Sequence, residues 1–160
     1  MRRGNTGGML SRSDAAAFAQ RLRAAGKQVV FTNGVFDLIH PGHVRYLQAA
    51  RSLGDALMVG VNADESVRRN KGEGRPVTPE RERAELIAAL ACVDAVTVFE
   101  EDTPAEVIRA IQPDVLVKGA DWAADQIVGR ETVEARGGRV VRMKIEDAWS
   151  SSSIIAKISG

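Results

Sequence analysis

The sequence predicts an α/β fold, a Rossmann-like five-stranded parallel sheet with helices on both faces. Two observations support this prediction. Short, continuously apolar runs rich in branched residues alternate along the chain with longer segments whose apolar residues repeat at helical spacing. Strict alternation of strand and helix requires parallel strands joined by right-handed crossovers, and such crossovers cover both faces of the sheet with helices.

The apolar runs are the predicted strands. Each is compact, β-branched and apolar at successive positions, which is typical of a strand buried on both faces. The runs span residues 28–32, 56–61, 95–99, 115–118 and 139–143.

The periodic segments are the predicted helices. They span about residues 13–24, 44–53, 78–91, 103–111 and 151–158. Thr78 and Thr103 are each followed by proline, which favours a threonine cap with proline at the first helical position. Helical spacing then predicts that Leu86, Ile87 and Leu90 face the core.

The length of 160 residues favours one domain. We expect a flexible, basic N-terminal tail over residues 1–12 and a single domain over residues 13–160, because no repeat or linker divides the chain. Residues 68–76 are polar and glycine-rich, and predict a mobile loop.

Composition excludes several classes of protein. The net charge of +1 provides no basic field for nucleic acid or membrane. The single cysteine, Cys92, cannot form an intramolecular disulfide and fits a reducing compartment. No apolar run approaches the roughly 20 residues that span a bilayer. We therefore expect a cytoplasmic protein.

Polar and ionisable residues follow the predicted strands. Ligands of parallel sheets bind outside the carboxyl ends of the strands, so this edge is the candidate site. The residues concerned lie at 32–34, 40–43, 62–66, 100–102, 118–122 and 146–153.

Both histidines of the chain lie in the sequence HPGH, residues 40–43. Pro41 and Gly42 predict the start of a helix, which places His43 in its first turn and His40 just before it. A helix N-terminus attracts anions, and two imidazoles could donate to the same phosphate. The alternatives are ordinary surface histidines or two ligands of a metal ion.

Other residues at this edge also suit phosphate chemistry. The P-loop and dinucleotide-binding glycine motifs are absent, so phosphate must be held in another way. The serines at 150–153 offer hydroxyls and amides, although they could simply cap the last helix. Lys71 and Lys118 are the cations best placed for phosphate.

Carboxylates and an aromatic ring complete the candidate set. Asp37, Asp64 and Asp121 could bind hydroxyls, act as a base or hold a metal. Trp122 could stack on a ligand ring or serve packing alone. Asp94 precedes a strand at the opposite edge and is interpreted as structural.

The run TNGVFDLIHPGHVRYLQAARSLGDALMVGVNADES resembles the opening of the HxGH nucleotidylyltransferases. The segments NKGEGRPV, EEDTPAEVI, PDVLVKGADW and the serines near the C-terminus extend the resemblance over most of residues 27–158. Within that superfamily, the sequence is most similar to the heptose 1-phosphate adenylyltransferases of lipopolysaccharide assembly.

The resemblance implies the nucleotidylyltransferase fold and transfer of AMP from ATP to a heptose 1-phosphate, with release of pyrophosphate. It implies catalytic roles for His40, His43 and Lys71. The residues expected to bind the nucleotide are Thr32, Asn33, Gly34, Phe36, Gly42, Asn62, Asp64, Ser150, Ser151 and Ser152. Those expected to bind the acceptor are Asp37, Lys118, Asp121 and Trp122. Mg²⁺ is expected on the ATP phosphates without dedicated protein ligands, and a homo-oligomer (dimer or higher) is implied.

Three alternatives stay open. A cytidylyltransferase acting on a small alcohol phosphate such as glycerol 3-phosphate has similar TNGVFD and GADW segments, but it usually carries arginine where this chain has Ile145. A nucleotide-binding module without turnover would have little use for both histidines, the lysine loop and the serines together. A metal-dependent hydrolase using His40, His43 and Asp37 would need further ligands.

Overall fold

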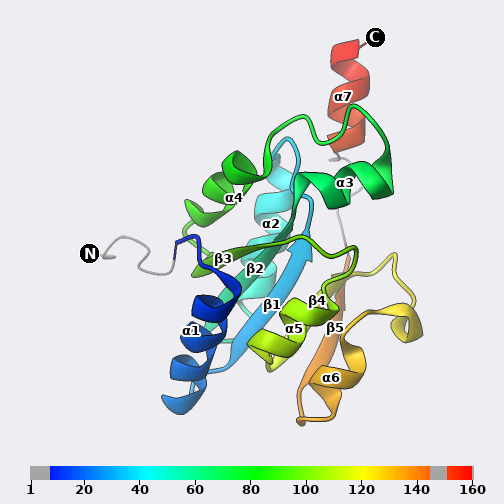
Figure 1. Ribbon diagram of the computed structural model, residues 1–160. Coiled ribbons are helices and arrows are strands. Elements are labelled where there is room, and N and C mark those ends of the chain that lie inside the picture. The colour runs from blue at the N-terminus through cyan, green and yellow to red at the C-terminus, as the bar shows by residue number, and fades with distance from the viewer. Residues whose placement is uncertain (1–7, 145–150, 160) are drawn as a thin grey trace.

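The computed structural model describes residues 8–144 and 151–159. Within these residues, five strands form one parallel sheet in the order β3-β2-β1-β4-β5, which confirms the predicted α/β fold class (Figure 1). The strands are Val29–Gly34 (β1), Ala56–Asn62 (β2), Ala95–Phe99 (β3), Val115–Gly119 (β4) and Arg139–Met143 (β5).

Helices cover both faces of the sheet (Figure 1). Their bounds are Arg12–Ala24 (α1), Pro41–Arg51 (α2), Asp64–Lys71 (α3), Glu80–Ala88 (α4), Ala105–Ile111 (α5), Arg130–Glu134 (α6) and Ser151–Ser159 (α7), with a short 3₁₀ helix at Ala124–Gln126 (η1). The buried residues of α1, α5 and α6 pack on one face, and those of α2 and α4 on the other. Because both faces are covered, β2 is buried at every position. In the part of the chain that the structure describes, no helix has the length and apolarity to cross a membrane.

The strand order determines where a ligand site is expected on the sheet. The chain runs outward from β1 through β2 to β3 and then returns to the other side of β1 with β4, so the strand order reverses beside β1. The register of β1 with β4 covers the pairs Val30–Val115 and Phe31–Leu116, whereas six pairs join β1 to β2. The shorter pairing leaves the carboxyl end of β1 open toward β4, where ligands of such sheets bind.

Three aspartates accept backbone hydrogen bonds at the opposite, amino-terminal edge of the sheet. The side chains of Asp55, Asp94 and Asp114 each accept a hydrogen bond from a backbone N–H of a neighbouring strand or its approach, at 2.7, 2.8 and 2.8 Å. Buried backbone donors need such partners. The structural interpretation of Asp94 is therefore confirmed, because its carboxylate accepts from Leu57 N–H.

The N-terminal segment and the last strand differ from expectation. Residues 1–12 are expected to form a flexible tail, yet Leu10 N–H donates to Val96 O across 2.8 Å and Arg12 begins α1. The segment thus covers part of the outer edge of β3, which would otherwise present unpaired groups. The opposite edge strand, β5, is expected to be buried, but its residues are exposed or half-buried because it lies at the edge of the sheet and pairs with β4 on one side.

Helix positions differ as well. Part of the expected mobile loop, up to Lys71, is helical in α3, and the helix ends at Gly72, whose φ of 88° suits glycine. Proline, not threonine, occupies the cap positions of α4 and α5, and neither helix has a side-chain cap. Leu86 is 51% exposed, so its predicted burial is wrong. Arg83 occupies the buried face of α4 instead.

Candidate functional site

The two histidines form a reciprocal cap at the start of α2. His43 N–H donates to Nδ1 of His40 across 3.4 Å, and His40 N–H donates to Nδ1 of His43 across 3.3 Å. Their rings stack with centroids 3.7 Å apart. Pro41 follows at the first helical position, where its missing N–H costs nothing. The HPGH sequence therefore fixes both imidazoles at a helix N-terminus.

This cap determines what the imidazoles can donate. Because each Nδ1 accepts a backbone N–H, the proton of each neutral ring is on Nε2. Burial and the adjacent His40 lower the pKa of His43 to about 4, against a smaller opposing effect of Asp37. Burial also lowers the pKa of His40. At neutral pH the pair therefore consists of uncharged rings with Nε2–H donors beside the positive end of the α2 dipole.

Phe36 packs against His43. It is buried, with φ of 52°, and its ring meets the His43 ring edge-on at 5.5 Å. A Cβ on Gly34 would lie 3.0 Å from Phe36 Cε2, so the glycine makes room for this ring. Phe36 thus contacts the ring of His43, and its expected role in binding the nucleotide stays a prediction.

Asp37 anchors the segment that follows α3. Its buried carboxylate accepts the backbone N–H groups of Val77 and Thr78 at 2.8 and 2.9 Å, and pairs with Arg75 at 3.3 Å. Burial works to raise the pKa of Asp37, but these three donors outweigh it and hold the pKa below its usual range. Asp37 thus holds the loop at 75–78, and its expected acceptor contact stays a prediction.

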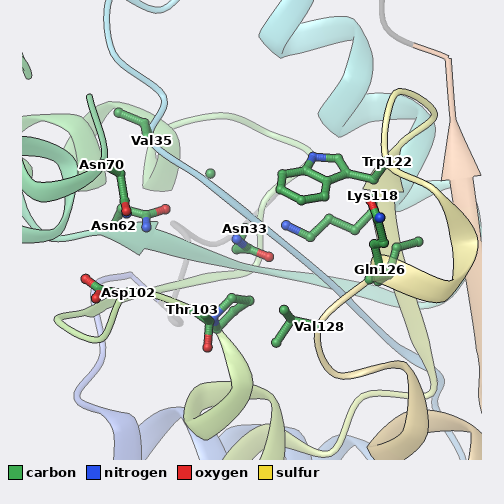
Figure 2. A pocket seen from close by; sticks show the side chains of 13 residues that line it. Asn33, Val35, Asn62, Asn70, Asp102, Thr103, Lys118, Trp122, Gln126 and Val128 are labelled. Carbon is green, nitrogen blue, oxygen red and sulfur yellow. The ribbon is translucent and has the colours of Figure 1, made fainter. Parts of the chain in front are cut away.

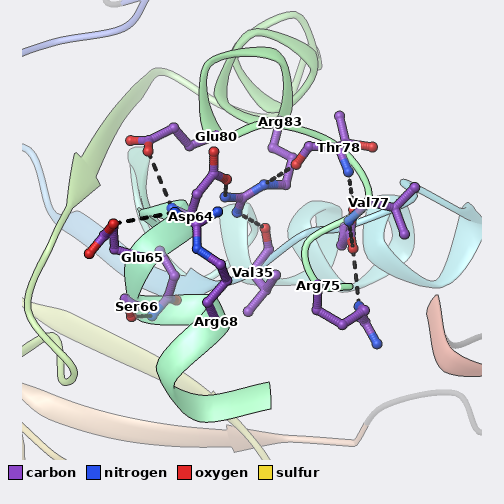
Figure 3. A network of polar contacts seen from close by, with 12 residues as sticks. Val35, Asp64, Glu65, Ser66, Arg68, Arg75, Val77, Thr78, Glu80 and Arg83 are labelled. Atoms are coloured by element: carbon purple, nitrogen blue, oxygen red, sulfur yellow. Dashed lines mark hydrogen bonds and ion pairs between the residues drawn. The ribbon is translucent and has the colours of Figure 1, made fainter. Parts of the chain in front are cut away.

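Arg83 is the centre of a network that sequence reasoning missed (Figure 3). Its fully buried guanidinium donates to the carbonyls of Val35 and Thr78 at 2.6 and 2.8 Å, and pairs with Asp64 at 2.7 Å. The network joins the segments after β1, after β2 and before α4. Asp64 is therefore ion-paired within the fold, and its expected nucleotide contact stays a prediction. Position 83 lies one helical turn before buried Ile87, and this spacing was the available signal.

A cavity of about 470 Å³ opens at the carboxyl ends of β1, β2 and β4 (Figure 2). It brings together five of the expected residues: Asn33, Gly34, Asn62, Lys118 and Trp122. Sequence reasoning did not select several others that line it, among them Asn70, Asp102, Thr103 and Gln126. The sequence places residues 100–102 at this edge, but it carries no signal for the helical position of Asn70.

Lys118 and Trp122 lie together on the β4 side of this cavity (Figure 2). The Lys118 Nζ is 5.7 Å from the centroid of the Trp122 ring, and the tryptophan is 50% exposed. Burial lowers the pKa of Lys118 to about 8, although nearby Asp121 works to raise it. Asp121 itself is exposed beside the cavity-lining Trp122.

Other expected residues lie elsewhere. The Thr32 hydroxyl is buried, donates to Val117 O at 2.9 Å and lies 2.9 Å from Tyr46 Oη, and the expected nucleotide contact of Thr32 stays a prediction. Gly42 is buried in the first turn of α2, and Lys71 is exposed at the end of α3. Ser150 lies outside the described residues, as do the side chains of Ser151 and Ser152 at the start of α7.

Among residues 8–144 and 151–159, no group of three or more His, Cys, Asp or Glu side chains could hold a metal ion. Mg²⁺ bound together with a nucleotide commonly takes phosphate oxygens as ligands.

Known proteins resemble this chain in sequence and structure. The bifunctional protein HldE of Citrifermentans bemidjiense is 59% identical over 138 residues, which cover 86% of this chain and 28% of that protein. HldE of Geobacter sulfurreducens is 56% identical over 136 residues, covering 85% and 28%. The chain thus spans about 28% of the length of these curated relatives.

A solved structure has the same fold. The crystal structure of the lipopolysaccharide core biosynthesis protein from Thermoplasma volcanium matches with a TM-score of 0.65 and 32% identity, over 76% of this chain and all of that one. The family model described as cytidylyltransferase-like matches residues 31–157, a range that begins in β1 and contains both histidines and the cavity. The chain belongs to the cytidylyltransferase-like family.

Proposed function

We propose that the chain transfers AMP from ATP to a heptose 1-phosphate, forming ADP-heptose and pyrophosphate for lipopolysaccharide core biosynthesis. The observation that carries this proposal is the reciprocal cap of His40 and His43, which fixes two Nε2–H donors at the N-terminus of an 11-residue helix. The likeness to the lipopolysaccharide core biosynthesis protein of Thermoplasma volcanium supports the pathway. The resemblance to heptose 1-phosphate adenylyltransferases supports the substrates.

The reaction needs positioning more than acid–base chemistry. An oxygen of the acceptor phosphate attacks the α-phosphorus of ATP and forms a new P–O bond, while the bond to the bridging oxygen breaks and pyrophosphate leaves. The acceptor phosphate is already ionised at neutral pH, so no proton has to be removed. Charge that develops on the α-phosphate can be stabilised by fixed donors, and this is the role of the two imidazoles.

The low pKa of His43 decides how it acts. At about 4 in the ligand-free protein, it leaves the ring neutral at pH 7, so His43 meets the phosphate as a hydrogen-bond donor. Positive charge comes from elsewhere. Lys71 and the serines at 150–152 are proposed to meet the triphosphate, and Mg²⁺ to neutralise its β- and γ-phosphates. The activity would take place in the cytoplasm, in a homo-oligomer.

Pyrophosphate release tests the proposal. ATP with heptose 1-phosphate should release pyrophosphate efficiently, with ADP-heptose as the second product. The family match to cytidylyltransferase-like proteins favours a second candidate, transfer of CMP from CTP to glycerol 3-phosphate. Efficient release from that pair, with none from ATP and heptose 1-phosphate, would replace the first candidate by the second. Release from neither pair would leave a nucleotide-binding module.

A further inference from the structure

The 470 Å³ cavity has a lining that the transfer chemistry above does not require. Its polar side chains are mainly carboxamides, from Asn33, Asn62, Asn70 and Gln126 (Figure 2). A carboxamide carries no charge and offers both donors and an acceptor. Sugar hydroxyls also donate and accept, so the two groups are complementary. Phosphates require cations or clustered N–H groups, and Lys118 is the one cation among the described residues that line the cavity.

Asn33 carries an atom that lacks a hydrogen-bond partner among the described residues. This atom is Oδ1, and it is buried. Figure 2 shows the Asn33 side chain in the middle of the cavity, between Asn62 and Lys118. A buried acceptor without a partner is unfavourable and uncommon in folded proteins. A half-turn of the amide, which exchanges its oxygen and nitrogen, would turn this acceptor toward the cavity, where a ligand hydroxyl would satisfy it.

The far wall suits the remaining parts of a sugar phosphate. The Trp122 ring is half exposed and lines the cavity, so it offers an apolar face to the C–H face of a sugar ring. Lys118, 5.7 Å from that ring, offers a cation to the phosphate. The volume falls within the range of small-molecule sites, about 300 to 1,000 Å³.

We propose that this cavity binds the sugar ring of the acceptor. Asn33, Asn62 and Asn70 hydrogen-bond its hydroxyls, its apolar face packs on Trp122, and Lys118 faces its phosphate. Asn33 and Asn62 are thereby moved from the nucleotide, where the resemblance placed them, to the acceptor. The inference rests on the proposed function, because it takes the acceptor to be a sugar phosphate.

Trp122 reports binding without any turnover. The chain has two tryptophans, so Trp149→Phe leaves Trp122 as the fluorophore. This protein is titrated with heptose 1-phosphate, mannose 1-phosphate or glycerol 3-phosphate in the presence of α,β-methylene-ATP, which cannot release pyrophosphate. Both sugar phosphates should change the emission saturably, with dissociation constants at least about 10-fold lower than that of glycerol 3-phosphate. Equal constants for all three ligands, or no response to any, would overturn the subsite.

Single substitutions test which asparagines contact the sugar phosphate. Asn33→Ala and Asn70→Ala should each raise the dissociation constant for heptose 1-phosphate by about 10-fold and leave that for ATP unchanged. Asn70 is exposed, so its variant keeps the test informative if Asn33→Ala fails to fold. Gln20→Ala, an exposed carboxamide on α1, is the matched control and should change neither constant. Weakened ATP binding with normal sugar binding would assign the cavity to the nucleotide and overturn the proposal.

The two proposals fail separately. If Trp122 reports sugar binding but wild-type protein releases no pyrophosphate, the proposed function is refuted and the sugar subsite stands. If pyrophosphate is released normally while Asn33→Ala and Asn70→Ala leave the KM for heptose 1-phosphate unchanged, the subsite is refuted and the proposed function stands.

Discussion

Replacing Arg83 by methionine should destabilise the protein strongly. Methionine fills much of the same volume and keeps the helical propensity of α4. It removes the donors that bridge Val35, Thr78 and Asp64 (Figure 3). The segments after β1, after β2 and before α4 would then lose their shared partner.

The magnitude follows from the three contacts. The carbonyls of Val35 and Thr78 lose their donors at 2.6 and 2.8 Å, at about 1–3 kcal/mol each. The Asp64 side chain is 21% exposed, so water compensates for part of its lost ion pair. We expect a total loss of about 3 kcal/mol in the free energy of unfolding. For a chain of this length, that corresponds to a fall in Tm of about 6–12 °C.

Arg81→Met is the matched control, because Arg81 lies on the same helix and is exposed. Its effect should stay within about 0.5 kcal/mol. Thermal and urea unfolding of both variants, followed by circular dichroism, gives the comparison. If Arg83→Met unfolds at the same temperature as Arg81→Met, the buried network does not stabilise the fold and the assignment of its role is wrong.

Three further predictions concern titratable groups. Asp37→Ala removes the acceptor of two backbone amides and should lower stability by about 2 kcal/mol, measured by urea unfolding; the same midpoint as for the exposed Asp121→Ala would contradict it. The folded pKa of His43 is about 4, below its unfolded value of 6.5, so the unfolded chain binds its proton first as the pH falls. The free energy of unfolding should therefore decrease as the pH falls from about 6.5 to 4, and it should decrease less steeply in His43→Ala. The same pH dependence for both proteins, measured by denaturant titrations at several pH values, would refute this. The pKa of Lys118 is about 8, so its charge is lost above that pH and the KM for sugar phosphate should rise there; a rise that persists in Lys118→Gln would show that another group is responsible.

The fold was predictable because its signals are local. Strands buried on both faces read as continuous apolar runs, and β3 and β5 have the predicted bounds. The exposure of β5 was not predictable in this way, because it depends on the strand's position at the sheet edge and not on its own residues. Helix α3 was missed because its sequence is almost entirely polar, which makes its apolar face a single residue, Val67.

The site was predictable where one short segment builds it. His40 and His43 are three residues apart, so a local motif places them together. The cavity instead combines Asn33, Asn70 and Gln126 from separate segments, and only the folded chain brings them together. The burial of Arg83 likewise depends on partners from three separate segments, namely Val35, Asp64 and Thr78. A long charged side chain is usually solvated, so periodicity alone argued weakly for its burial.

The most direct test of the account compares pyrophosphate release from ATP and heptose 1-phosphate by wild-type protein and His43→Ala. The variant loses one fixed donor to the developing charge, so its kcat should fall by about 100- to 1000-fold, or roughly 3–4 kcal/mol. Loss of the cap on His40 N–H should cost only about 1 kcal/mol of stability, so the variant should remain folded. A folded His43→Ala protein with near-normal kcat would contradict the claim that the paired imidazoles drive the transfer.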